Sequence, residues 1–152
     1  MAAQRADAFG RPLRGKVLIV DDQEGMRDLL KLLLENHYQV AEADSGAALH
    51  QALNHDQPDV VLLDLALPDA NGLGLLPAIK QRWPETEVIV LTGAVHASET
   101  RLWAAEAVNL GAFGLLSKSA EFSCQELLCG VNSAMERRSQ APGANNCLPP
   151  QA

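Results

Sequence analysis

The run VVLLD at residues 60–64 is almost entirely apolar and ends in one acidic residue, Asp64. A run of this length fits a strand better than a helix. Because no polar residue alternates with the apolar ones, the run suits the middle of a parallel sheet that helices cover on both faces. Residues 60–64 therefore predict a central strand, and Asp64 marks its end.

Other short apolar runs recur on both sides of this one. They are KVLIV at 16–20, QVAEA at 39–43, EVIVLT at 87–92 and FGLLSK at 113–118. The stretches between them have helical length and helical spacing of apolar residues. This alternation predicts an α/β fold, a doubly wound parallel sheet of five strands with helices on both faces. The runs at 16–20 and 87–92 should also be central, because they are nearly as continuously apolar, and the other two should form the edges.

Length and composition favour one domain with loose ends. The chain has 152 residues and a hydrophobic content of 47%, enough for one well-buried core but short for two ordinary domains. Residues 1–15 show no periodicity, and residues 139–152 have the Pro, Gly and Asn content of a linker. We expect a flexible N-terminal extension, a domain over residues 16–138, and a disordered tail or the start of a linker from 139.

The charge and the cysteines exclude several classes of partner and site. A net charge of −7 repels nucleic-acid phosphates and anionic lipid, so we expect no direct contact of this domain with nucleic acid or membrane. Neither a secretion signal nor a membrane-spanning segment is visible, which favours a cytoplasmic location. Cys124, Cys129 and Cys147 have no zinc or redox spacing, so we expect reduced structural thiols.

Several helix ends can be read from the sequence. Ser45 stands before an apolar helical stretch, and Ser123 with the glutamate three residues on forms a plausible capping box. After the fourth strand, ASETRLWAAEAVNLG at 97–111 has Ser98 as a candidate cap and Gly111 as a stop. This stretch predicts a helix of more than about ten residues. The alternative is a lengthened loop before Ser98.

Polar residues stand where the predicted strands end. Asp21 and Asp22 follow the first strand, Asp64 ends the third, Thr92 ends the fourth, and Lys118 ends the fifth. Ligands of open parallel sheets bind at the carboxyl ends of the strands, so these groups should meet at one edge. Carboxylates brought together raise each other's pKa unless a divalent cation or a lysine neutralises them. Mg²⁺ is the natural partner, because it prefers carboxylate and water oxygens.

A carboxylate beside Mg²⁺ can attack phosphorus and form an acyl phosphate. The transferring group carries spread negative charge, so its transfer depends on positioning and neutralisation. Lys118 can supply positive charge, and the Thr92 hydroxyl can donate a hydrogen bond to a phosphoryl oxygen. Each of these residues alone is more often a strand-end polar group or a helix cap. Their joint occurrence at one edge favours phosphoryl chemistry instead.

Across residues 16–136 the sequence resembles the receiver domains of two-component response regulators, the CheY-like family. The resemblance lies in VLIVDD at 17–22, VVLLDLALPDANG at 60–72, VIVLTG at 88–93 and GAFGLLSK at 111–118. It implies a flavodoxin-like fold and a signalling switch in which Asp64 accepts a phosphoryl group from a sensor histidine kinase or phosphotransfer protein. It further implies Mg²⁺ held by Asp22, Asp64 and the backbone carbonyl of Ala66, with Asp21 acting through water. Thr92 and Lys118 would contact the phosphoryl group.

The resemblance is greatest to receivers that precede enhancer-binding transcription activators. It implies a role in transcription regulation and a homodimer through the face of the fourth helix and fifth strand. Such a domain catalyses only its own phosphoryl transfer and dephosphorylation, so it is not an enzyme acting on other substrates.

The sequence departs from the family pattern at a few positions. Leu115 stands three residues before the lysine, where the family usually has an aromatic residue that moves with the threonine. Phe113 should share the strand face of Leu115 but lie farther from the site. Ser119 replaces the usual proline after Lys118, and Ala66 is small where many relatives contact the hydrolytic water. We therefore expect weaker switching than in receivers that carry the aromatic residue.

Two other functions compete with a switch. The first is a degenerate receiver used only as a docking module, which Leu115 favours and the complete Asp, Thr and Lys set disfavours. The second is an aspartyl-phosphate phosphohydrolase, which needs an aspartate two residues after the nucleophile. Ala66 occupies that position and argues against this enzyme class.

Overall fold

The predicted strands form one parallel sheet in a computed structural model that describes residues 15–93, 97–118 and 124–139. They are β1 (Lys16–Val20), β2 (Gln39–Ala43), β3 (Val60–Asp64), β4 (Glu87–Thr92) and β5 (Gly114–Ser117). Their order in the sheet is β2-β1-β3-β4-β5. The central position of β1, β3 and β4 and the edge position of β2 and β5 are thereby confirmed.

Burial follows this order. Every residue of β3 and β4 is buried, whereas β5 is only partly buried along its length. The central strands are apolar throughout because both of their faces are covered. Successive side chains of β1 enter opposite cores, with Leu18 and Val20 on one side and Val17 and Ile19 on the other.

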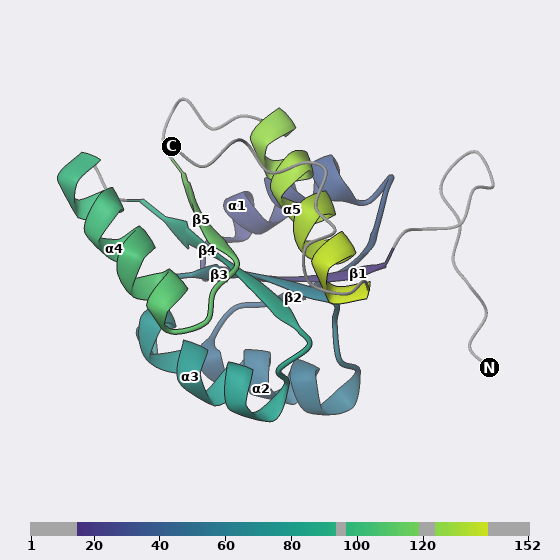
Figure 1. Cartoon of the computed structure of the whole chain (residues 1–152). Coiled ribbons are helices and arrows are strands. Elements are labelled where there is room, and N and C mark those ends of the chain that lie inside the picture. Colours follow the sequence, from purple (N-terminus) through teal and green to yellow (C-terminus); the bar gives the residue numbers. More distant parts are fainter. Residues whose placement is uncertain (1–14, 94–96, 119–123, 140–152) are drawn as a thin grey trace.

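Helices cover both faces of the sheet (Figure 1). They are α1 (Glu24–Leu34), α2 (Gly46–His55), α3 (Gly72–Arg82), α4 (Ala97–Asn109) and α5 (Cys124–Ser139). One apolar core joins the sheet to α1 and α5 through residues such as Leu30 and Leu127. The other core joins it to α2, α3 and α4 through residues such as Leu49, Leu76 and Ala107. The predicted doubly wound α/β fold is confirmed.

The helix-end predictions have mixed outcomes. Ser45 caps α2, because its Oγ accepts a hydrogen bond from Ala48 N at 3.1 Å. The helix α4 spans 13 residues, which confirms a helix longer than ten residues. It begins at Ala97, so Ser98 lies inside it and the prediction of Ser98 as its cap is wrong. The proposed cap Ser123 lies outside the described residues.

Gly111 ends α4, as predicted. Its φ of 107° lies in the left-handed region that favours glycine. Gly111 N donates to Val108 O at 3.0 Å and Ala112 N donates to Ala107 O at 2.9 Å, the two hydrogen bonds of a Schellman cap. A Cβ at position 111 would also lie 2.8 Å from Cγ of Lys80. Both the backbone conformation and the contact with α3 therefore require glycine.

Three further expectations concern the chain termini, membrane-spanning helices and the state of the cysteine thiols. Residues 1–14 and 140–152 lie outside the described part, so the loose ends remain predictions. None of the helices in the described part has the length and apolar character to cross a membrane. Cys129 of α5 is disulfide-bonded, so the expectation of reduced thiols is wrong for this residue. The cysteine spacing could not reveal it, because a disulfide depends on which sulfurs the fold brings together.

Gly111→Ala should lower the free energy of unfolding by about 1.5 kcal/mol, because alanine is strained at positive φ. Urea denaturation measures the change. Gly74→Ala in α3 is the matched control, since a Cβ there meets nothing within 4 Å. Its expected effect is a stabilisation of about 0.5 kcal/mol, from the lower flexibility of alanine. Equal effects of the two substitutions would contradict the role assigned to Gly111.

Candidate functional site

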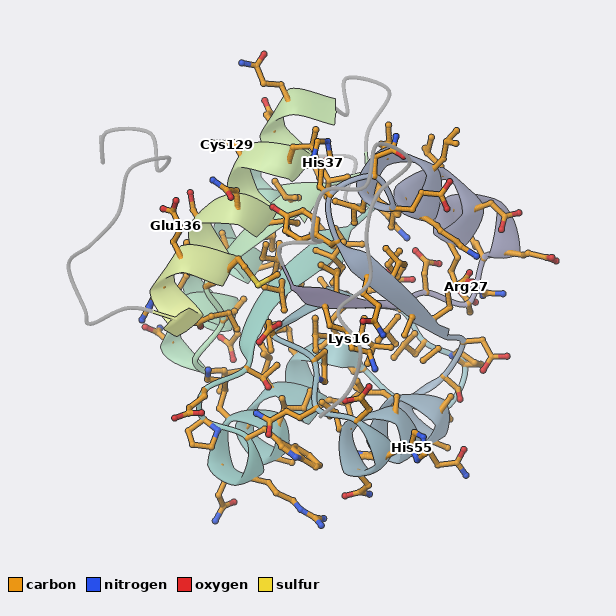
Figure 2. All side chains as sticks on the ribbon, turned by 90° about the vertical axis from the view of Figure 1, so that its right-hand side faces the viewer. Lys16, Arg27, His37, His55, Cys129 and Glu136 are labelled. Carbon is orange, nitrogen blue, oxygen red and sulfur yellow. The ribbon has the colours of Figure 1, made fainter. Side chains whose placement is uncertain are left out.

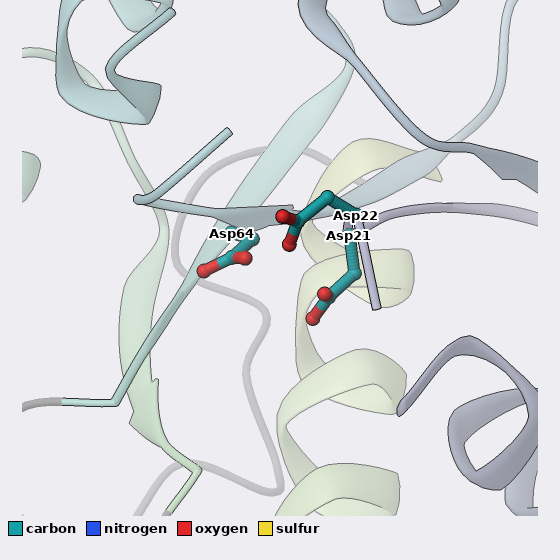
Figure 3. Close-up of side chains that lie close together, drawn as sticks. All are labelled: Asp21, Asp22 and Asp64. Atoms are coloured by element: carbon teal, nitrogen blue, oxygen red, sulfur yellow. The ribbon is translucent and has the colours of Figure 1, made fainter. Parts of the chain in front are cut away.

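Three aspartates meet at the carboxyl edge of the sheet. Asp21 and Asp22 follow β1, and Asp64 ends the neighbouring strand β3. One carboxylate oxygen from each lies within 4.8 Å of the others, and Figure 3 shows the three side chains close together. In the described residues this is the one group of three acidic, histidine or cysteine side chains close enough to share a metal ion. The predicted convergence of these carboxylates is confirmed.

Asp21 is held by donors from several elements. Its side chain is fully buried, with Oδ2 at 3.0 Å from Lys118 Nζ and Oδ1 accepting from Gln23 N at 2.9 Å. Its backbone oxygen accepts from Nη1 of Arg27 on α1 at 2.6 Å (Arg27 is labelled in Figure 2). Asp22, by contrast, is exposed. The two neighbouring aspartates therefore differ: protein groups fix Asp21, while Asp22 faces solvent.

Lys118 joins two of the carboxylates. Its Nζ lies 3.0 Å from Asp21 and 3.3 Å from Oδ1 of Asp64, and its side chain is only 11% exposed. Burial works to lower the pKa of this ammonium. The hydrogen bond with Asp21 and the negative charges of Asp64 and Asp21 outweigh it and raise the pKa above its usual value. Lys118 therefore stays charged and offsets part of the acidic cluster.

Burial raises the pKa of Asp64, and the nearby charge of Asp21 adds to the increase. The charge of Lys118 and the N–H of Ala66, which donates to Oδ1 at 3.3 Å, act in the opposite direction. The net increase means that the present neighbours do not fully compensate the buried negative charge. A further cation at this edge would complete the compensation, so the donor set fits a divalent metal ion.

The loop after Asp64 is a small hairpin, residues 65–71. Ala66 and Asn71 form an antiparallel bridge, and Gly72 N donates to Leu65 O at 2.8 Å. Gly72 must be glycine, because a Cβ would lie 2.5 Å from the backbone oxygen of Asp64. The close packing of Gly72 fixes the start of α3 against the end of β3.

Thr92 lies at the end of β4, one position beyond Leu91, the partner of Asp64 in the sheet. It is buried, and its backbone oxygen accepts from Lys118 N at 2.7 Å. The ends of β4 and β5 are thus tied together beside Asp64. Both strand-end residues predicted from the sequence, Thr92 and Lys118, lie on the same edge as the aspartates.

Phe113 and Leu115 face opposite sides of the sheet, so the prediction of a shared face is wrong. Leu115 packs against the core under α2, α3 and α4, whereas Phe113 joins the core under α1 and α5. Two-residue alternation fails because Phe113 precedes β5, which begins at Gly114 after the turn that follows α4. The guanidinium of Arg137 lies 5.5 Å from the Phe113 ring centre. Phe113 is therefore part of the α5 side and cannot replace a ring at position 115.

Two residues beside this site were not predicted from the sequence. Arg27 binds the backbone of Asp21, and Asp69 in the hairpin binds the start of α2. Both are single charged residues, and no spacing pattern in the sequence marks them.

Next to the hairpin lies a pocket of about 400 Å³, lined by residues 65–67, 70–71, Leu73 and Trp103 of α4.

Comparison with known proteins finds one family. A model described as the response regulator receiver domain matches residues 17–128. The chain is 33% identical over 134 residues to the DNA-binding transcriptional regulator NtrC of Proteus hauseri, covering 88% of this chain and 27% of that protein. It is 38% identical over 106 residues to the transcriptional regulatory protein YdfI of Bacillus subtilis, covering 68% and 47%. The chain thus spans half or less of these relatives.

Solved structures agree with this match. The receiver domain of NtrX from Brucella abortus superposes with a TM-score of 0.72 at 28% identity, covering 80% of this chain and 98% of that one. The beryllofluoride-activated NtrC4 receiver domain dimer gives a TM-score of 0.72 at 29% identity, covering 81% and 98%. Each of the two matched chains is a receiver domain, and the likeness extends over 98% of its length.

Replacing Lys118 with methionine should lower the free energy of unfolding of the metal-free protein by about 3 kcal/mol, because two buried carboxylates lose their cation. Urea denaturation in the presence of a chelator measures the loss. Lys16→Met is the control, since Lys16 (labelled in Figure 2) pairs with Asp56, whose side chain is 57% exposed. That change should cost less than about 1 kcal/mol. Similar losses for both variants would show that Lys118 does not stabilise the acidic cluster.

Proposed function

This chain belongs to the response-regulator receiver family, and on that basis we propose that it is a Mg²⁺-dependent phosphorylation switch whose phosphoacceptor is Asp64. The observation that carries the proposal is the position of Asp64, whose Oδ1 lies 3.3 Å from Nζ of Lys118 and whose carboxylate shares one cluster with those of Asp21 and Asp22. This arrangement combines a carboxylate nucleophile with an ammonium group that neutralises negative charge and with carboxylates that can bind a cation. A phosphoryl transfer needs both.

The reaction proposed is transfer from a phosphohistidine of a sensor histidine kinase or phosphotransfer protein. A carboxylate oxygen of Asp64 forms a bond to phosphorus as the bond from phosphorus to the histidine nitrogen breaks, and the imidazole leaves with its electron pair. The ammonium of Lys118 offsets the charge of the phosphoryl oxygens, and the hydroxyl of Thr92 donates to one of them. The domain promotes only its own phosphorylation and dephosphorylation.

Asp22, Asp64 and the backbone oxygen of Ala66 are the groups proposed to hold Mg²⁺, with Asp21 acting through water. The exposure of Asp22 supports this division, since Asp21 is already engaged by Lys118 and Gln23. When bound, the ion supplies positive charge that neutralises the carboxylates and the incoming phosphoryl oxygens. Ala66 carries no acid group, which disfavours a phosphohydrolase.

The proposed consequence of phosphorylation is a change in partner binding. Leu102 and Val108 of α4 are large apolar residues, 70% and 54% exposed, which supports a homodimer through the face of α4 and β5. The relatives are transcriptional regulators of which this chain matches only a part, so we propose a cytoplasmic role in transcription regulation. A docking-only role remains the second candidate because of Leu115.

Incubation with acetyl phosphate should add one phosphoryl group to the chain only when Mg²⁺ is present. Intact mass measures the increment, and Asp64→Asn should abolish it because the nucleophilic carboxylate is gone. Retention of the increment in Asp64→Asn would contradict the site assignment. An unmodified wild-type chain under these conditions would favour the docking-only alternative.

Leu115→Tyr should enlarge the response to phosphorylation, because the ring would couple movement of Thr92 to the outer face. Amide chemical shifts with and without beryllofluoride measure this response in both proteins. In the wild type, shifts should stay near Asp64 and Thr92, and in the variant they should extend along β5 and α4. Shifts that already reach both elements fully in the wild type would refute the prediction of weak switching.

A further inference from the structure

The hairpin 65–71 carries the backbone oxygen of Ala66. The backbone hydrogen bonds that join it to the sheet lie at its base, and Leu65 and Leu67 pack against the core under α2, α3 and α4. Leu65 N donates to Leu91 O at 3.1 Å, and Gly72 N donates to Leu65 O at 2.8 Å. Beyond these bonds the two sides of the hairpin pair with each other, as in the bond from Leu67 N to Ala70 O at 3.2 Å. Neither these bonds nor the packing of Leu67 reaches the tip at residues 68 and 69, so another contact sets its position.

Asp69, at the tip of the hairpin, makes that contact. Its Oδ1 accepts from Gly46 N at 2.8 Å and its Oδ2 accepts from Ala47 N at 3.0 Å. These are the first two N–H groups of α2, which lack partners within the helix. Ser45 serves the third N–H, through the bond from Ala48 N to its Oγ. Two side chains therefore cap α2: Ser45 comes from the preceding residue and Asp69 from the hairpin.

The opposite side of the hairpin is open. The pocket of about 400 Å³ separates residues of the hairpin from Trp103 of α4. The tip is thus held toward α2 by Asp69, while among the described residues a pocket lies between the hairpin and α4. If the two bonds of Asp69 were removed, the hairpin would have room to move toward Trp103.

The charge of Asp69 suits this contact. Hydrogen bonds from the N–H groups of Gly46 and Ala47 hold the pKa of the carboxyl below its usual value. The positive end of the α2 dipole favours the same ionised form. Glycine at position 46 permits this close approach. A Cβ added there would lie 3.2 Å from Oδ1 of Asp69, which is a tight contact. The bond pair therefore persists at neutral pH.

We propose that Asp69 is a positioning residue for the metal site, which pins the hairpin to α2 and so holds the backbone oxygen of Ala66 toward Asp64 and Asp22. Asp69 does not itself contact the ion. The inference rests on the proposed function, because it assumes that the Ala66 oxygen is a Mg²⁺ ligand. It adds that the start of α2 is part of the support of this ligand.

Calorimetric titration with Mg²⁺, without any phosphodonor, tests this role. Asp69→Ala should weaken Mg²⁺ binding about tenfold, the size of effect typical when a residue that orients a ligand is lost. Asp69→Asn should fall between wild type and Asp69→Ala, because its one amide oxygen can keep one of the two bonds. This milder variant also keeps the test valid if Asp69→Ala does not fold.

Ser45→Ala is the matched control, because it removes a cap of the same helix without touching the hairpin. It should bind Mg²⁺ like the wild type. In the metal-free proteins, Asp69→Asn should shift the amide signals of both the hairpin and α2, while Ser45→Ala should shift those of α2 alone.

Unchanged Mg²⁺ binding in Asp69→Asn and Asp69→Ala would overturn the inference. An equal loss in Ser45→Ala would do so too, since Asp69 would then act only through the stability of α2. These outcomes leave the proposed function intact as long as the wild type binds Mg²⁺ and is phosphorylated. Absence of Mg²⁺ binding in the wild type would overturn both.

Discussion

The electrostatic repulsion among Asp21, Asp22 and Asp64 is the constraint on which the rest of this site depends. A parallel sheet places the ends of β1 and β3 side by side, so the residues that carry these carboxylates are held close together. Lys118 compensates part of the charge from the end of β5, on the far side of β4. The raised pKa of Asp64 indicates that compensation is incomplete, and this excess of negative charge is what suits the edge to a cation.

The elements around the acidic cluster fix its geometry through contacts with backbone groups. Gly72 packs directly on the backbone of Asp64, and Arg27 holds the backbone of Asp21 from α1. Asp69 extends this support to α2 through the hairpin. Each contact joins a backbone group of one element to a residue of another, so the site is connected directly to α1, α2 and α3. A switch requires this kind of coupling.

The same framework explains where this chain differs from receivers with an aromatic residue before the lysine. Leu115 is packed against the core on the α4 side, and Phe113 belongs to the α5 side, where it contacts Arg137. The strand β5 therefore has no aromatic side chain that could move together with Thr92. Large exposed apolar residues lie instead on two helices of the described part, Leu102 and Val108 on α4 and Leu29 and Leu32 on α1.

The sequence by itself determined the strands, their central or edge positions, and the meeting of the strand-end residues Asp21, Asp22, Asp64, Thr92 and Lys118 at one edge. These follow from local patterns, because unbroken apolar runs indicate buried parallel strands and all strands of such a sheet end on the same side. Only the tertiary structure decided on which face of the sheet Phe113 lies. It also decided the hydrogen bond from Arg27 to the backbone of Asp21 and the hydrogen bonds that Asp69 accepts from the start of α2. The Phe113 prediction failed because the turn before β5 interrupts the two-residue period. The Arg27 and Asp69 contacts join a single charged side chain to backbone groups of another element, and no residue spacing encodes such a pairing.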